Sequence, residues 1–174
     1  MKKIIYLVVF LSAILVSSCS KDEGYVENVD EKELTSCPLN YDCTYYYSER
    51  SNVEDNSLMI TKGNYRVFWS EGGLPGFSVR AFILAPVNGT SFYLSEKEVL
   101  AGRIKYLSVC PACLSIPLEI GGGYSKGKLV NPANGSGSQK WLVETKLYLK
   151  FAGSSNAKFI DTVFVKQYYY LNQQ

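Results

Sequence analysis

Residues 140–151 read KWLVETKLYLKF, and their pattern indicates the fold class most clearly. Their apolar and polar side chains alternate with a period of two. The apolar face of this segment would carry Trp141, Val143, Thr145, Leu147, Leu149 and Phe151, and the polar face Glu144, Lys146, Tyr148 and Lys150. Side chains of a β-strand point alternately to its two faces, so the alternation predicts a half-buried strand.

A turn and a second strand follow this segment. Residues 153–157 read GSSNA, a composition typical of a turn, and residues 158–171 again form an apolar strand pattern. Two strand patterns joined by a short turn of this kind predict a β-hairpin.

The same pattern recurs upstream, from Cys37 onward. The further predicted strands are Cys43–Ser48, Leu58–Thr61, Tyr65–Ser70, Phe77–Leu84, Ser91–Ser95, Arg103–Val109, Leu114–Ile120 and Gly123–Val130. Gly, Pro and Asn in the intervening segments predict turns, and only Glu96–Ala101 is predicted as a short helical turn. Many short strands predict a single all-β domain, either an antiparallel β-sandwich or a barrel-like sheet, and the pattern does not choose between them.

The first residues have a different character. Two lysines, Lys2 and Lys3, precede an apolar run from Ile4 to Val16 that only Ser12 interrupts. This run is too short for a membrane span, which needs about twenty residues. A positive start, a short apolar run and small residues after it are typical of a secretory signal, so we expect a signal peptide over residues 1–18.

The residues that end this run resemble two known signals. Val16-Ser17-Ser18-Cys19 resembles the lipobox of bacterial lipoproteins, which implies that diacylglycerol is joined to the thiol of Cys19 and anchors the protein in a membrane. Lys21, Asp22 and Glu23 then resemble the surface-export signal of Bacteroidota lipoproteins, a lysine followed by two acidic residues. This resemblance implies the outer membrane, with the domain facing the cell exterior. The alternatives are a periplasm-facing anchor and a solvated acidic tether.

Length and charge divide the chain further. We expect residues 19–36 to be an acidic, flexible tether, and residues 37–174 to be one all-β domain. Loss of Lys2 and Lys3 with the signal would leave 16 basic against 16 acidic residues. The domain has no dense run of lysine and arginine, so we expect no nucleic-acid partner.

Four cysteines remain beside Cys19. They are Cys37, Cys43, Cys110 and Cys113. An even number in an exported domain predicts disulfides, with three possible pairings. The Cys-Pro-Ala-Cys spacing is also that of thioredoxin-like redox sites, but the β-like, proline-containing segment after it disfavours that interpretation. A zinc site is disfavoured because an oxidising compartment favours disulfides, so we expect no metal.

The sequence offers little for catalysis. It contains no histidine, which excludes the Ser-His-Asp and Cys-His arrangements. The glycines at 121–123 precede a strand and not a helix, so they are no phosphate-binding loop, and we expect no cofactor. A pair of carboxylates could hydrolyse glycosides, but the acidic residues of the domain are few and scattered.

Aromatic residues are the remaining feature. Two triplets are consecutive: Tyr45, Tyr46 and Tyr47, and Tyr168, Tyr169 and Tyr170. Because side chains alternate along a strand, at least one ring of each triplet should face away from the core. Such rings can stack on sugars or anchor a partner protein, or they can simply pair across strands. We expect Trp69 and Trp141 in the core.

Three functions follow, in order of preference. The first is a lipid-anchored, non-catalytic binding module for a glycan or another surface component. The second is a structural envelope protein that docks onto another outer-membrane component through an exposed strand or apolar patch. The third and weakest is a hydrolase that uses carboxylates.

Overall fold

The computed structural model describes residues 29–55, 57–111, 117–130, 139–154 and 158–172. The strands are β1 (Asp42–Val53), β2 (Ile60–Lys62), β3 (Tyr65–Leu74), β4 (Phe77–Pro86), β5 (Ser91–Leu94), β6 (Ile104–Val109), β7 (Leu118–Val130), β8 (Lys140–Phe151) and β9 (Asp161–Leu171). A short helix, α2 (Glu96–Glu98), continues into the π-helical turn η1 (Val99–Arg103). Within the described ranges no helix is long and apolar enough to cross a membrane.

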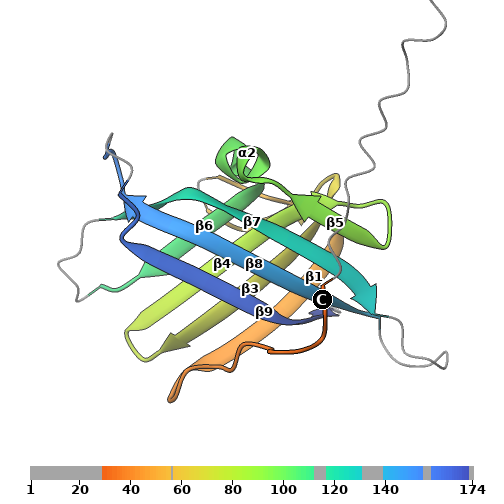
Figure 1. Cartoon of the computed structure of the whole chain (residues 1–174), viewed down its shortest axis with the longest axis horizontal. Coiled ribbons are helices and arrows are strands. Elements are labelled where there is room, and N and C mark those ends of the chain that lie inside the picture. The colour runs from red at the N-terminus through yellow and green to blue at the C-terminus, as the bar shows by residue number, and fades with distance from the viewer. Residues whose placement is uncertain (1–28, 56, 112–116, 131–138, 155–157, 173–174) are drawn as a thin grey trace, which may run out of the picture.

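The described strands form one nine-stranded sheet. Its order is β5-β7-β8-β9-β1-β3-β4-β6, with β2 paired to β1 alone. Figure 1 shows β7, β8 and β9 in front of β1, β3, β4 and β6, so the sheet curls back on itself as a half-barrel. The all-β, barrel-like prediction is confirmed. The sheet is mixed and not purely antiparallel, because β9 forms a hairpin with β8 and then runs parallel to β1.

The predicted β8–β9 hairpin is present, with Trp141 opposite Tyr169 and Leu149 opposite Asp161. Trp141, Leu147 and Leu149 are buried, as the alternation predicts. The expected burial of Phe151 was wrong: its side chain is 42% exposed because it is the last residue of the strand.

Two predicted strands are in fact one. Over the described residues, β7 covers both the end of the predicted strand 114–120 and the strand 123–130. A bulge between Ile120 and Gly122 shifts its register against β8. Gly123 has a φ of 131°, and a Cβ there would overlap the Lys146 carbonyl oxygen. Glycine is therefore required at this position of the bulged strand.

Five aromatic rings from five different strands fill the inside of the half-barrel. Phe68 lies at the centre of this cluster. Its ring centroid is 5.3–5.7 Å from those of Tyr47, Phe92, Trp141 and Tyr169. Because each of these rings is almost fully buried, the cluster joins strands that are distant in the sequence into one core.

A smaller core lies on the outer face of β3 and β4. Val53, Val67, Phe82 and Leu84 are buried there, and Ile60 of β2 packs against them. The chain reaches this position because β1 has a bulge between Ser48 and Ser51, after which its last residues pair with β2. The hairpin of residues 54–62 therefore covers part of the outer face.

Residues 29–36, the described part of the predicted tether, contact the outer face of β9. Val29 is buried, and the Asp30 carboxylate lies 2.7 Å from the Lys166 ammonium. The backbone N–H of Thr35 donates to the Lys166 carbonyl, and the Lys166 N–H donates to the Thr35 hydroxyl. This segment is therefore held on the domain by backbone and side-chain contacts.

Candidate functional site

A groove of about 660 Å³ lies on the outer face of β1 and β3, beside the hairpin that carries β2. Thr44, Tyr46 and Ser48 of β1 line it because alternate residues of a strand share a face. Trp69 and Glu71 contribute from β3, where they are paired with Tyr46 and Thr44 across the ladder. The groove thus follows β1 over several residues.

Three aromatic rings form a row across the groove face. The Tyr46 and Trp69 ring centroids are 5.8 Å apart, with their planes tilted by 42°. Tyr170 is the partner of Tyr46 in the parallel β1–β9 ladder, so it lies on the same face. Tyr46 is 38% and Tyr170 45% exposed. We refer to Tyr46, Trp69 and Tyr170 as the aromatic row.

The bulge in β1 places cationic residues at one end of the groove. Arg50 lies within the bulge with a φ of 50°, and its carbonyl accepts a hydrogen bond of 2.8 Å from the Gly63 N–H. Lys62 is opposite Ser51 in the β1–β2 ladder. Both side chains line the groove and are exposed. Bulges commonly redirect side chains in this way beside functional sites.

The acidic residue of the groove is already bound. The Glu71 carboxylate accepts hydrogen bonds of 2.9 and 2.7 Å from the Arg80 guanidinium. Arg50 and Lys62, by contrast, form no ion pair with any described residue. The groove therefore has one carboxylate, which Arg80 neutralises, and two cations without an ion-pair partner among the described residues.

Hydrogen-bonding side chains complete the lining. The hydroxyls of Thr44, Ser48 and Thr61 and the amide of Asn172 lie along the groove. Asn172 is held there because its backbone N–H donates to the Tyr47 carbonyl at 2.9 Å. Such groups both donate and accept, so they suit a ligand that is rich in hydroxyls.

The predicted tyrosines divide between the two faces of the sheet. Tyr47 and Tyr169 are buried in the core, and Tyr45 packs edge-on against Tyr169 with centroids 5.5 Å apart. Burial raises the pKa of Tyr169 far above its ordinary value. Tyr46 and Tyr170 face outward, so each triplet has a ring away from the core, as predicted.

Tyr168 also lies on the outer face but is engaged by the N-terminal segment. Its hydroxyl donates to the Glu31 carboxylate at 2.7 Å, and this hydrogen bond raises the pKa of Tyr168. The Lys140 ammonium lies 3.9 Å from the centre of its ring. Tyr168 is therefore less available to a ligand than Tyr46 or Tyr170.

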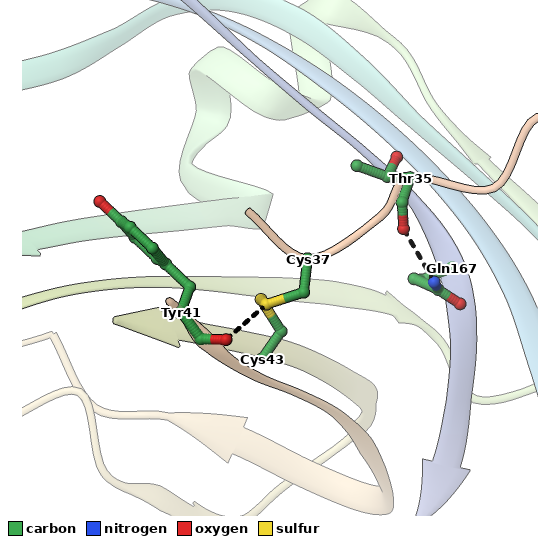
Figure 2. The surroundings of a disulfide bond; sticks show 5 residues. All are labelled: Thr35, Cys37, Tyr41, Cys43 and Gln167. Carbon is green, nitrogen blue, oxygen red and sulfur yellow. Dashed lines mark hydrogen bonds between the residues drawn. A yellow bond between two sulfur atoms is a disulfide. The ribbon is translucent and has the colours of Figure 1, made fainter. Parts of the chain in front are cut away.

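The predicted disulfides are partly described. Cys37 and Cys43 are bonded to each other, and Figure 2 shows this loop beside Thr35, whose carbonyl accepts a hydrogen bond from Gln167. Cys110 is also disulfide-bonded. The fourth candidate, Cys113, lies outside the described residues.

The Cys37–Cys43 loop borders a second, smaller hollow of about 220 Å³ between β1 and β9. Its lining is mainly apolar and includes Tyr45, Val79, Ala81 and Val163. It forms where β1 and β9 diverge, because these strands pair over only two residues.

Other predicted sites cannot be placed. Cys19, Lys21, Asp22 and Glu23 lie outside the described residues. In the part of the chain that the structure describes, no three His, Cys, Asp or Glu side chains are grouped to hold a metal ion.

Of the residues that line the groove, the sequence indicated only Tyr46 as a candidate for binding, and Trp69, Arg50 and Lys62 are among those it missed. Trp141 lies in the core as expected, whereas Trp69 is half-buried on the opposite face of the sheet from Phe68. The adjacent Phe68 and Trp69 were a usable signal, because consecutive rings in a strand must point to opposite faces. Nothing in the sequence indicated that a bulge would bring Arg50 beside Lys62.

Comparison with known proteins adds no family to this picture. No protein-family model, curated protein or solved structure matches the chain. The residues of the groove are therefore the basis on which its function is inferred.

Proposed function

We propose that the chain is a lipid-anchored cell-surface protein whose domain is a non-catalytic glycan-binding module, with the groove on β1 and β3 as its binding site. One observation carries this proposal. The aromatic row lies in and beside a groove that hydroxyl, amide and cationic side chains also line.

The chemistry of sugars matches this lining. A sugar ring has an apolar C–H face that packs on an aromatic ring, and hydroxyls at its edge that require hydrogen bonds. Tyr46 and Trp69 supply aromatic surface, and Thr44, Ser48 and Asn172 supply hydrogen-bonding groups. A ligand lying along β1 would contact both sets at once.

The same lining favours binding over hydrolysis. Glycosidases of the two-carboxylate type need an acid and a second carboxylate on either side of the scissile bond. Among the described residues that line the groove, Glu71 is the one carboxylate, and Arg80 binds it with two hydrogen bonds. A group held in this way is poorly placed to act as a general acid.

The location is part of the proposal. A lipid on Cys19 would hold the protein at the outer membrane, and the acidic signal after it would direct the domain to the cell exterior. We expect that alanine at Lys21, Asp22 and Glu23 leaves lipidation intact but protects the protein from protease added to intact cells. Equal protease sensitivity of the variant would contradict surface export and favour a periplasm-facing anchor.

The binding proposal is tested by native gel retardation of the purified protein in a panel of polysaccharides. We expect retardation by at least one polymer, and a loss of affinity of about tenfold for Trp69→Ala or Tyr46→Ala, because each removes apolar surface that the ligand would bury. Tyr93→Ala is the matched control, since Tyr93 is 42% exposed but lies on β5, outside the groove lining. Failure of every polymer to retard the protein would refute glycan binding.

One observation favours the second function, docking onto another envelope component. Near the turn between β8 and β9, Phe151, Phe159, Ile160 and Phe164 are each between 42% and 44% exposed. Phe159 also stacks on Tyr148 with centroids 5.1 Å apart. Exposed apolar side chains in this number can form a protein contact. Crosslinking on intact cells that captures a defined partner, and fails for Phe159→Ser, would support this function.

A further inference from the structure

The charge of the groove specifies the class of glycan. We propose that the groove selects an anionic polysaccharide, with Arg50 and Lys62 binding its acidic groups while Tyr46 and Trp69 stack on its sugar rings. This inference rests on the proposed function and narrows it to one chemistry.

Neither Arg50 nor Lys62 is neutralised by an acidic side chain of the described residues. Six other basic side chains of the described residues form ion pairs, among them Arg66 with Glu49, Lys105 with Asp55 and Lys150 with Glu119. Arg50 and Lys62 are exposed, line the groove, and form no ion pair within the described ranges. Groups in this state are available to a ligand at no cost in broken interactions.

The backbone brings Arg50 and Lys62 to the same end of the groove. Arg50 lies in the bulge of β1 and directly precedes Ser51, which is opposite Lys62 in the β1–β2 ladder. A hydrogen bond from the Gly63 N–H to the Arg50 carbonyl joins the two segments at this point. Gly63 allows the close approach, because a Cβ there would lie 2.5 Å from the Cβ of Asn52.

The carboxylate of Glu71 does not neutralise the positive charge of Arg50 and Lys62. Arg80 neutralises Glu71, and Glu71 lies opposite Thr44, at the other end of the groove from Arg50. A guanidinium and an ammonium that line the same groove suit carboxylate or sulfate groups, to which arginine can donate two parallel hydrogen bonds.

The distance between the two features suits a polymer. Along β1, Arg50 lies four residues beyond Tyr46, which at about 3.3 Å per residue is at most roughly 13 Å, because the bulge between Ser48 and Ser51 shortens the path. A ligand that stacks on Tyr46 and Trp69 and also reaches Arg50 must therefore be longer than one sugar ring. The structure thus favours an acidic chain over a free acidic monosaccharide.

The experiment compares charged and uncharged forms of the same polymers. The purified protein is titrated with polygalacturonate, alginate and hyaluronate, with their methyl-esterified forms, and with neutral dextran, mannan and xylan. We expect tighter binding of at least one acidic polymer than of its ester. Its affinity should fall between 0.1 and 1 M NaCl, as the Debye length falls from about 10 to about 3 Å. This comparison needs no variant and so cannot be confused by misfolding.

A double variant then locates the charge. Arg50→Gln with Lys62→Gln should weaken binding of the acidic polymer roughly threefold to thirtyfold, the range for two exposed ion pairs. Lys97→Gln with Lys158→Gln removes the same charge from two exposed positions outside the groove lining and should change the affinity by less than about twofold.

Each other outcome overturns the inference. Equal binding of acidic and esterified polymers, lost in Trp69→Ala, would leave the glycan-binding function standing but remove charge selection. Equal losses in the two double variants would show that net charge, and not the groove, attracts the polymer. Absence of binding to every polymer would overturn both the inference and the proposed function.

Discussion

Replacing Glu144 by glutamine should reveal whether this carboxylate belongs to a largely buried charge cluster. The Glu144 carboxylate lies 3.3 Å from the Lys126 ammonium and 3.6 Å from that of Lys166. The exposed fractions of the three side chains are 12%, 9% and 8%. Glutamine keeps the volume and the oxygen that accepts from the Tyr124 hydroxyl, so charge is what changes.

The expected cost follows from burial. Removing one partner of a buried ion pair costs about 3–5 kcal/mol, because the other charge is left uncompensated. Lys166 keeps the Asp30 carboxylate at 2.7 Å, so part of this cost is avoided. We therefore expect Glu144→Gln to lower the free energy of unfolding by about 2–3 kcal/mol.

Urea unfolding followed by tryptophan fluorescence measures this loss. Glu119→Gln is the matched control, because Glu119 is paired with Lys150 at 3.1 Å on the sheet surface, with 42% of its side chain exposed. Exposed pairs contribute less than about 1 kcal/mol. If the two variants agree within about 0.5 kcal/mol, the idea that Glu144 is a buried charge is wrong.

Three further changes test the fold. Replacing Cys37 and Cys43 by serine should lower the free energy of unfolding by about 2 kcal/mol, measured in urea, which is the chain-entropy value for a separation of 6 residues. An unchanged free energy would mean that this disulfide does not restrict the unfolded chain. Gly123→Ala should cost on the order of 3 kcal/mol or more, because its Cβ would overlap the backbone of β8, and a wild-type melting temperature would contradict the bulge. The Lys166 ammonium, by its hydrogen bond, lowers the pKa of Asp30 below the ordinary 3.8. The Asp30–Lys166 contact is therefore complete above pH 3.8 and is lost as the pH falls through the lowered pKa. The protection of the amides of residues 30–36 against hydrogen exchange should fall only in acid, and Asp30→Asn should reduce this protection already at neutral pH.

Local patterns in the sequence predicted most of the strands. The alternation in residues 140–151 identified β8 and the hairpin with β9, because period-two burial is a property of one strand and its immediate partner. The same rule predicted that at least one ring of each tyrosine triplet faces outward, and in the structure these rings are Tyr46 and Tyr170. These inferences required only the direction of each side chain.

Contacts between distant segments could not be predicted. The site depends on Tyr46, Trp69 and Tyr170 meeting across β1, β3 and β9, and the parallel β1–β9 pairing that unites them leaves no local signal. Glu144 was expected on a polar, solvent-facing side of its strand. Its side chain is instead largely shielded from solvent, beside Lys166, which Asp30 of the N-terminal segment also contacts, and alternation alone does not reveal such a neighbour.

Two segments cover parts of the outer face of the sheet, and the part that they leave open bears on the function. Residues 29–36 cover the charges of β8 and β9, and the hairpin 54–62 covers the apolar side chains of β3 and β4. Between them lies the aromatic row, uncovered at Tyr46 and Tyr170. Cross-strand pairing explains why rings are stable there, but it does not explain a groove with two unpaired cations beside them. A ligand that has both apolar faces and acidic groups would account for the rings and the cations together, which is why we propose a binding site on this strip of the sheet.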